Sequence, residues 1–272
     1  MNNPSRLAKA LQKKAFIPFI MAGDPDLATT LGLLKALPAA GADIIELGVP
    51  FSDPTADGKE IQTAGIRALK SGTTLKKILA LVAAFRLENT HTPIVLMGYY
   101  NPVYAYGIQV FCDDAVKAGV DGVILVDLPP EEEAEFAIPA TTAGLDLVRL
   151  ISPTTNDARI KMITTAATGF VYYVSLKGVT GAAALATETV QTAVNHIKTF
   201  SSLPVGVGFG IKTPEQAKTV AAFADAVIVG SAIVQKIAEN LDSTGKPLPR
   251  LHSTVVSFLT GMAAAVHTNE AL

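Results

Sequence analysis

The stretch DIIELGVPFSDPTADGKEIQTAGIRALK, residues 43–70, contains the unit from which the fold can be derived. Residues 43–47 form a short run dominated by Ile and Leu, a long polar loop follows, and residues 61–70 carry apolar side chains at helical spacing. A short apolar run without alternating polarity is typical of a parallel strand that is buried on both faces. The stretch therefore predicts one strand, one loop and one helix.

The same unit recurs along the chain, because short apolar runs alternate with longer segments of helical spacing. Further strands are predicted at residues 15–20, 94–97, 122–126, 145–151, 170–174, 204–208 and 226–229. Further helices are predicted at residues 27–37, 75–85, 109–118, 131–143, 157–166, 188–200, 214–223 and 248–264, and a polar amphipathic helix precedes the first strand.

This order of elements indicates a (β/α)₈ TIM barrel, which occupies about 250 residues as one domain. The alternative is an open doubly wound sheet, whose first strand usually leads into a G-x-G-x-x-G turn. Here the first strand leads into MAGDP, residues 21–25, and the glycine-rich turns come late in the chain. We therefore predict an α/β fold, a single TIM-barrel domain over residues 1–272 with an extra N-terminal helix.

The composition limits the classes of function. Apolar residues make up 49% and charged residues 17% of the 272 residues, which favours a large buried core over disorder. The net charge is −2 and the paired lysines at 13–14 and 76–77 are isolated, so we expect no nucleic-acid partner. No uninterrupted apolar run reaches about 18 residues, so we expect no membrane partner. The N-terminus lacks an apolar signal core, which predicts a cytoplasmic protein.

Cysteine and histidine point away from disulfide and metal chemistry. Cys112 is the only cysteine, which excludes a disulfide within the chain and a CxxC metal site. The 4 histidines lie far apart in the sequence and form no pair at ligand spacing. We therefore predict no metal site.

Glu46 is the first candidate for chemistry. It lies inside the predicted strand 43–47, among residues that should be buried. Burial of a carboxylate in apolar surroundings raises its pKa, which is what a general acid or base needs near neutral pH. The alternative is a structural carboxylate that is satisfied by backbone N–H groups or by an arginine.

The loop 51–60 offers two further carboxylates, Asp53 and Asp57. It is longer than the usual 2–6 residues of a βα loop, and it follows a strand at the end of a barrel where chemistry takes place. Asp-Pro and Asp-Gly are also common turn pairs. Taken from the residues alone, a turn-forming role is the stronger interpretation for each.

Glycine-rich turns follow the last three strands, at residues 178–181, 208–211 and 230–232. Loops after the seventh and eighth strands, with a short helix N-terminus, form the recurrent phosphate site of this fold. Glycine lets backbone N–H groups approach an anion, and the Ser231 hydroxyl could donate one more hydrogen bond. Tyrosines at 99–100 and 172–173 end two strands; they are core residues by default or line a pocket for a flat apolar group.

Together these stretches resemble the α subunit of tryptophan synthase. The most specific match is ELGVPFSDPTADG, residues 46–58, which is close to the signature of that family. Supporting matches run in the family's order from about residue 15 to 235: FIMAGDP at 19–25, YYNP at 99–102, DLPPE at 127–131, GVTG at 178–181, GFGI at 208–211 and GSAIV at 230–234.

The resemblance implies a lyase that cleaves indole-3-glycerol phosphate into indole and glyceraldehyde 3-phosphate. It implies that Glu46 transfers protons at indole C3 and at the glycerol hydroxyl, and that Asp57 accepts a hydrogen bond from the indole N–H. The phosphate would lie on Gly181, Gly210, Gly230 and Ser231, and Tyr172 would contact the substrate. The expected partner is a β subunit in an α₂β₂ tetramer, with pyridoxal phosphate in the β subunit and no cofactor in this chain.

The sequence departs from the family pattern at Thr55, at 59–60 and at Lys177, which affects expectations for loop details rather than the reaction. Three alternatives remain: a Schiff-base aldolase that uses Lys177, a stand-alone indole-producing lyase without a β subunit, and a catalytically silent barrel that acts as a binding or regulatory partner. Both signature carboxylates are present, which speaks against the last.

Residues 51–60 and 175–188 are predicted to be lids that become ordered on binding of ligand or partner. Each is long for its place, and the second contains glycines followed by a run of small residues. The resemblance implies that the Thr180 hydroxyl binds Asp57 when both loops close.

Overall fold

The computed structural model describes residues 5–174, 183–208 and 210–268 of the chain. The strands in this part of the chain are β1 (Ala15–Met21), β2 (Ile45–Gly48), β3 (Ile94–Gly98), β4 (Gly122–Leu125), β5 (Asp146–Leu147), β6 (Arg149–Ile151), β7 (Val171–Val174), β8 (Val205–Gly208) and β9 (Ala226–Val229). They form one sheet in the order β5-β4-β3-β2-β1-β9-β8-β7-β6, and the paired strands run parallel.

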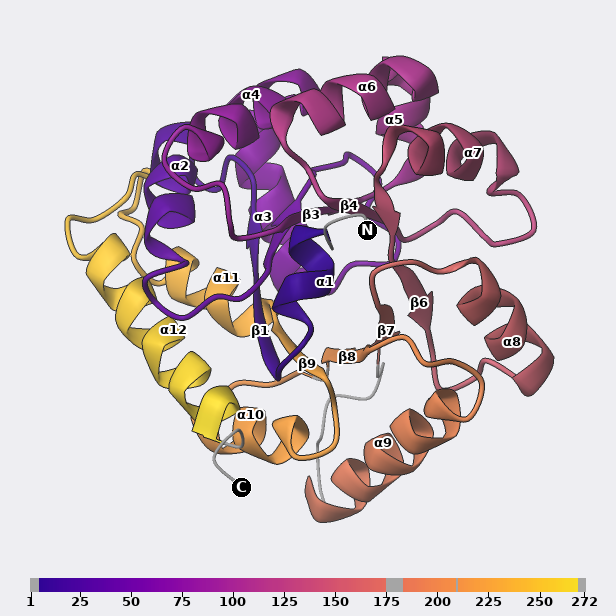
Figure 1. Cartoon of the computed structure of the whole chain (residues 1–272). Coiled ribbons are helices and arrows are strands. Elements are labelled where there is room, and N and C mark those ends of the chain that lie inside the picture. Colours follow the sequence, from indigo (N-terminus) through magenta and orange to yellow (C-terminus); the bar gives the residue numbers. More distant parts are fainter. Residues whose placement is uncertain (1–4, 175–182, 209, 269–272) are drawn as a thin grey trace.

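β5 and β6, at the two ends of this order, are the two halves of the single strand predicted at residues 145–151. β5 pairs with β4 through Gly122 and Asp146, and β6 pairs with β7 through Arg149 and Val171. The chain passes directly from one half to the other through Val148, so the sheet curls into a nearly closed barrel (Figure 1). The TIM-barrel prediction is therefore confirmed, with the fifth strand divided between the two edges.

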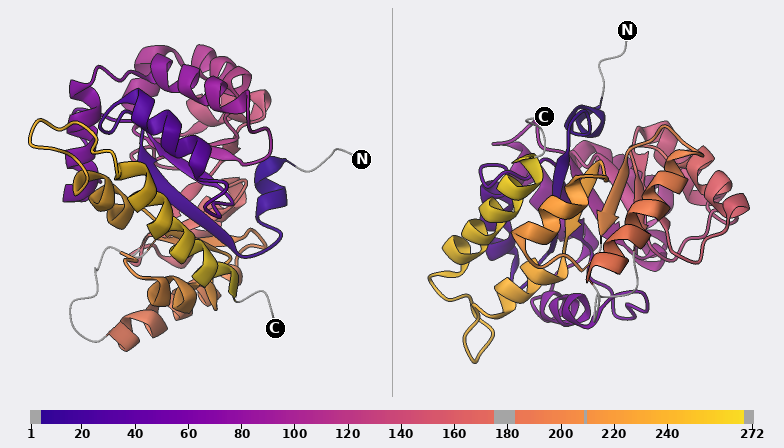
Figure 2. Two further views of the ribbon diagram at one scale, coloured as in Figure 1. Left: turned by 90° about the vertical axis from the view of Figure 1, so that its left-hand side faces the viewer. Right: turned by 90° about the horizontal axis from the view of Figure 1, so that it is seen from below.

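Helices surround the strands, and all but α1 lie in a ring outside them (Figure 1). In the described residues they are α1 (Arg6–Ala10), α2 (Leu27–Ala36), α3 (Lys59–Lys70), α4 (Leu75–Arg86), α5 (Tyr100–Tyr106), α6 (Ile108–Ala118), α7 (Ala134–Ala143), α8 (Asp157–Ala166), α9 (Ala183–Lys198), α10 (Pro214–Ala221), α11 (Ser231–Ala238) and α12 (Leu251–His267). The extra N-terminal helix is confirmed as α1, which lies across the amino-terminal end of the barrel (Figure 2).

Several helix boundaries differ from the predictions. α5 and α11 were not predicted, because Asn101-Pro102 is typical of a turn and residues 231–238 follow a glycine turn directly. α9 begins at residue 183 rather than 188, since the alanine-rich residues that the sequence suggested were unanchored are strong helix formers. α7 begins three residues later than predicted, and α12 lies three residues further along the chain.

The side chains of β2 and of the residue before it alternate between two environments. Ile44 belongs to the apolar cluster inside the barrel, and Ile45 and Leu47 belong to the cluster between the strands and the helices. Because successive side chains of a strand point to opposite faces, Glu46 shares the inward face with Ile44. Leu7 of α1, which is fully buried, fills the interior cluster from the amino-terminal end. The fold thus places one carboxyl group inside the barrel, toward its carboxyl-terminal end.

Candidate active site

Glu46 is buried without a compensating partner. Its residue is 2% exposed, and its Oε2 atom has no hydrogen-bond partner among the residues that the structure describes. Burial, and secondarily the negative charge of Asp57, raises the pKa of the Glu46 carboxyl to about 8. The structural alternative, a carboxylate satisfied by N–H groups or an arginine, does not fit these surroundings. At neutral pH the Glu46 carboxyl retains its proton.

Asp57 lies in the loop between β2 and α3 and is half-buried. Burial raises the pKa of its carboxyl to about 6, and a hydrogen bond with the Tyr99 side chain opposes that rise. The Tyr99 hydroxyl also accepts the Ala56 N–H at 2.9 Å. Tyr99, which ends the third predicted strand and precedes α5, therefore holds the Asp57 segment from the side of β3. From the sequence, Tyr99 was predicted only to pack in the core or to line a pocket, and its contact with the Asp57 segment was not predicted.

The two carboxyl groups differ in protonation near pH 7. Glu46, with a pKa of about 8, is neutral and can donate a proton, while Asp57, with a pKa of about 6, is mostly ionised and can stabilise a cation. A pair of carboxyl groups whose environments separate their pKa values can divide the roles of acid and anion. Asp53 lies in the same loop and is exposed.

A cavity of about 420 Å³ opens at the carboxyl-terminal ends of the strands, which is within the usual range for a site that encloses a small molecule. Its walls include Met97, Val126, Leu150 and Tyr172, and Asp57 contributes to its rim. Burial, and then the Glu46 charge, raises the pKa of the Tyr172 hydroxyl well above its ordinary value. The cavity therefore combines apolar side chains with the Asp57 carboxyl, and Tyr172 in its wall lies close enough to Glu46 for the two groups to interact.

Two of the turns that are predicted to bind phosphate lie within the described residues, and they follow two neighbouring strands. β8 leads to Gly210, whose φ of +55° belongs to the left-handed region, and β9 leads through Gly230 to Ser231, the first residue of α11. β8 and β9 pair side by side, so the two turns adjoin. The first N–H groups of a helix have no partner within it and favour an anion. Gly181, Thr180 and Lys177 lie outside the described residues.

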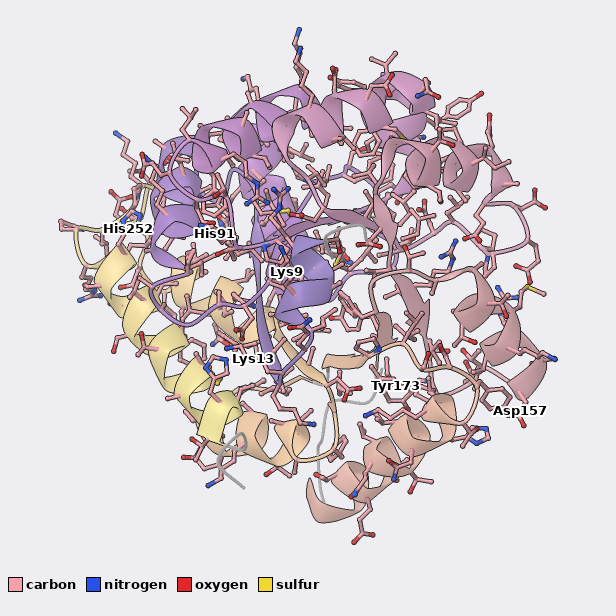
Figure 3. All side chains as sticks on the ribbon, in the orientation of Figure 1. Lys9, Lys13, His91, Asp157, Tyr173 and His252 are labelled. Carbon is pink, nitrogen blue, oxygen red and sulfur yellow. The ribbon has the colours of Figure 1, made fainter. Side chains whose placement is uncertain are left out.

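Other classes of site find no support in the described part of the chain. No group of three or more His, Cys, Asp and Glu side chains there could hold a metal ion. Among the same residues, no helix has the length and apolar character to cross a membrane. Figure 3 shows the labelled His252 at the left edge of the molecule, away from the barrel axis.

Comparisons with known proteins agree in the family that they identify. The profile described as "Tryptophan synthase alpha chain" matches residues 6–263. A structure of tryptophan synthase subunit alpha from Legionella pneumophila is 40% identical, with a TM-score of 0.88 over 98% of this chain and 100% of that chain. Tryptophan synthase from M. tuberculosis, in an open form with BRD0059 bound, is 32% identical, with a TM-score of 0.85 over 97% and 99%. A chain of the tryptophan synthase α₂β₂ complex from Pyrococcus furiosus is 40% identical, with a TM-score of 0.82 over 94% and 98%.

Proposed function

This chain belongs to the tryptophan synthase alpha chain family, and we propose that it cleaves indole-3-glycerol phosphate into indole and glyceraldehyde 3-phosphate. Membership of the family implies a lyase of tryptophan biosynthesis. The observation that carries the proposal is the Glu46 carboxyl, which is buried without a described hydrogen-bond partner and faces Tyr172 on the wall of the cavity. Such a neutral acid beside an apolar pocket suits proton transfer to the carbon of a flat ring.

In the proposed reaction, the neutral Glu46 carboxyl donates its proton to C3 of the indole ring. The ring becomes a positively charged indolenine, and ionised Asp57 accepts a hydrogen bond from its N–H. The Glu46 carboxylate then removes the proton from the hydroxyl on the adjacent carbon of the glycerol chain. The bond between that carbon and C3 breaks, its electrons return to the ring, and the aldehyde forms. Glu46 ends the cycle protonated, as it began.

Substrate binding is assigned to groups that surround this reaction. The phosphate of the substrate is held by backbone N–H groups at Gly210 and Gly230 and by the Ser231 hydroxyl, together with Gly181. Tyr172 packs against the indole ring, because it lines the same cavity as Asp57. Closure of the loops at residues 51–60 and 175–188, with Thr180 bound to Asp57, stays a prediction.

The partner in this proposal is a tryptophan synthase β subunit in an α₂β₂ tetramer in the cytoplasm. The support is the relative from Pyrococcus furiosus, which is a chain of an α₂β₂ complex. Indole passes to the β subunit, which supplies pyridoxal phosphate, and this chain needs no cofactor for acid/base chemistry of the kind derived above. A stand-alone lyase is the remaining alternative.

The direct test incubates the purified chain with indole-3-glycerol phosphate and measures release of both products, with and without a tryptophan synthase β subunit. We expect equimolar indole and glyceraldehyde 3-phosphate, a faster rate with the β subunit, and co-sedimentation of the two chains. Full activity without any complex would favour the stand-alone lyase. Absence of both products under both conditions, or substrate trapped on the chain by borohydride, would contradict the proposed reaction.

A further inference from the structure

The turn that carries Asp57 is fastened to the helix that follows it by one side chain. The Gln62 side-chain amide, in the first turns of α3, donates from Nε2 to the Asp57 carbonyl oxygen at 2.9 Å and to the Pro54 carbonyl oxygen at 3.3 Å. Both neighbours are backbone carbonyls, which only accept, so the NH₂ group and not the oxygen of the amide must face them. The interaction therefore requires a glutamine-like donor.

These bonds differ from ordinary helix capping. A capping side chain accepts hydrogen bonds from the free N–H groups at a helix start, whereas the Gln62 amide donates away from the helix, into the loop. The Gln62 backbone N–H already makes the first helical bond, to the Gly58 carbonyl oxygen at 3.0 Å. The side chain is not needed for the helix, and its two hydrogen bonds connect the helix to the turn between residues 54 and 57.

The opposite side of the same turn is held by Tyr99, whose hydroxyl accepts the Ala56 N–H. The Asp57 N–H closes the turn by donating to the Pro54 carbonyl oxygen at 3.2 Å. Gln62 and Tyr99 therefore hold the backbone on both sides of Asp57. From this backbone position, the Asp57 carboxyl forms a hydrogen bond with the Tyr99 side chain and lies close enough to Glu46 for their charges to interact.

The helix that carries Gln62 is itself fixed. One turn further along α3, Ala64 and Ala68 are fully buried against the barrel. Arg67 forms a two-bond ion pair with the Asp24 carboxylate, at 2.6 and 2.8 Å, and the Asp24 side chain is fully buried at the end of β1. A donor on such a helix has a defined position relative to the barrel.

We propose that Gln62 is a positioning residue for Asp57: by donating to the Pro54 and Asp57 carbonyl oxygens, it holds the Asp57 carboxylate at the edge of the cavity where the ring cation forms. This inference rests on the proposed function for its chemistry. A misplacement of about 1 Å can cost as much as 10²-fold in rate, so a single clamp of this kind can control turnover without touching the substrate.

The test replaces Gln62 in the full chain. Gln62→Met keeps length and volume but removes the donor, and Gln62→Asn keeps the amide but is one methylene too short to reach the turn. We expect each to lower kcat by about 10-fold to 10²-fold with KM changed by less than about 3-fold. Thr63→Val is the matched control, because Thr63 is exposed and its hydroxyl donates to the Lys59 carbonyl oxygen within the helix, and we expect it to leave kcat unchanged.

A titration of the Asp57 carboxyl carbon by ¹³C NMR separates positioning from a general loss of stability. In the wild type we expect a pKa of about 6, which burial causes. Release of the turn in Gln62→Met exposes the carboxyl to water, so its pKa falls toward the ordinary 3.8. An Asp57 pKa that stays at the wild-type value overturns the proposal, whatever happens to kcat, and so does a lowered pKa with full kcat. The titration needs no substrate, so it decides the clamp even if the wild type releases no indole and the proposed function fails.

Discussion

The three aspartates beneath the strands at the amino-terminal end of the barrel and the two candidate catalytic carboxyl groups at its carboxyl-terminal end have different surroundings. At the amino-terminal end, three aspartates that precede strands each accept a backbone N–H from the first or second residue of a neighbouring strand and also bind a basic side chain. At the carboxyl-terminal end, the Glu46 Oε2 atom has no hydrogen-bond partner among the described residues, and the Asp57 carboxyl forms a hydrogen bond with the Tyr99 side chain. Asp24 at the same end differs from both, because it forms an ion pair with Arg67. The three aspartates hold the strands in place, whereas Glu46 and Asp57 have carboxyl oxygens that can act on a ligand.

The contacts at the amino-terminal end are short. Figure 3 looks onto this end, with Lys9 and Lys13 in front of the strands. The three aspartates and their partners are Asp43 with the Phe16 N–H at 2.8 Å and His267 at 2.7 Å, Asp121 with the Ile94 N–H at 2.8 Å, Arg6 at 2.7 Å and Arg86 at 2.8 Å, and Asp225 with the Val205 N–H at 2.8 Å and Lys198 at 2.8 Å. Basic side chains therefore neutralise each of these three aspartates, which is not the case for the Glu46 carboxyl.

The largest expected effect is on turnover and comes from the carboxyl-terminal end. Glu46→Gln keeps the shape of the side chain and removes its acid/base chemistry, so cleavage should fall by at least about 10²-fold while substrate binding is largely kept. Glu60→Gln is the control, because Glu60 is an exposed carboxylate at the start of α3. The test is a measurement of kcat and KM for both variants. Near-normal turnover of Glu46→Gln would show that Glu46 is not the acid/base group.

The second effect is a bell-shaped dependence of kcat/KM on pH. Below a pH of about 6, protonation of Asp57 removes the anion that stabilises the ring cation. Above a pH of about 8, loss of the Glu46 proton removes the acid that begins the reaction. The rate should fall about 10-fold for each pH unit beyond either limit. A rate that keeps rising above pH 9, measured where the chain stays folded, would contradict the assignment of Glu46 as the acid.

The third effect, about 10-fold, concerns the anion site. A methyl group at Gly230 would meet the Phe19 Cβ atom at 3.5 Å, an ordinary contact that the barrel tolerates, but it would crowd an anion at the start of α11. Gly230→Ala should therefore weaken binding of glycerol phosphate about 10-fold, which is about 1.4 kcal/mol, and change binding of indole much less. Gly261→Ala on α12, where a methyl group meets Pro214 at 3.8 Å, is the matched control. Equal weakening of both ligands by Gly230→Ala would indicate a distorted barrel rather than a phosphate site.

Features that depend on the local pattern of apolar and polar residues could be predicted from the sequence. Burial of Glu46 follows from its place in an apolar strand, and the order of strands and helices predicts the barrel. The role of Asp57 could not be decided from the residues, because its surroundings depend on Tyr99, which lies 43 positions from Ala56 in the chain. Gln62 carries no signal at all, since a glutamine early in a helix usually lies in solvent. The division of the fifth strand at Val148 depends on closure of the whole sheet and has no local pattern.

The smallest effect on turnover, and the largest on stability, is expected from the amino-terminal end. The side chains of Asp121 and Arg86 are 7% and 11% exposed, and Asp121→Asn leaves the charge of Arg86 without its counterion. Removal of one partner of a buried pair typically costs about 3 kcal/mol, so chemical denaturation should show a lower free energy of unfolding. The kcat of the folded enzyme, measured well below its Tm, should stay within about 2-fold of the wild-type value.

Glu46→Gln should change stability in the opposite direction, with a pH dependence that identifies the cause. The pKa of Glu46 is raised from 4.5 in the unfolded chain to about 8 in the folded one, so between these values the folded chain holds a proton that the unfolded chain releases. Stability of the wild type therefore falls as pH rises through this window, whereas the glutamine variant has no such loss. The variant should be the more stable protein at pH 7 and match the wild type near pH 4. Equal stabilities at pH 7, in denaturation curves recorded side by side, would mean that Glu46 is satisfied inside the barrel and that the two ends do not differ as argued.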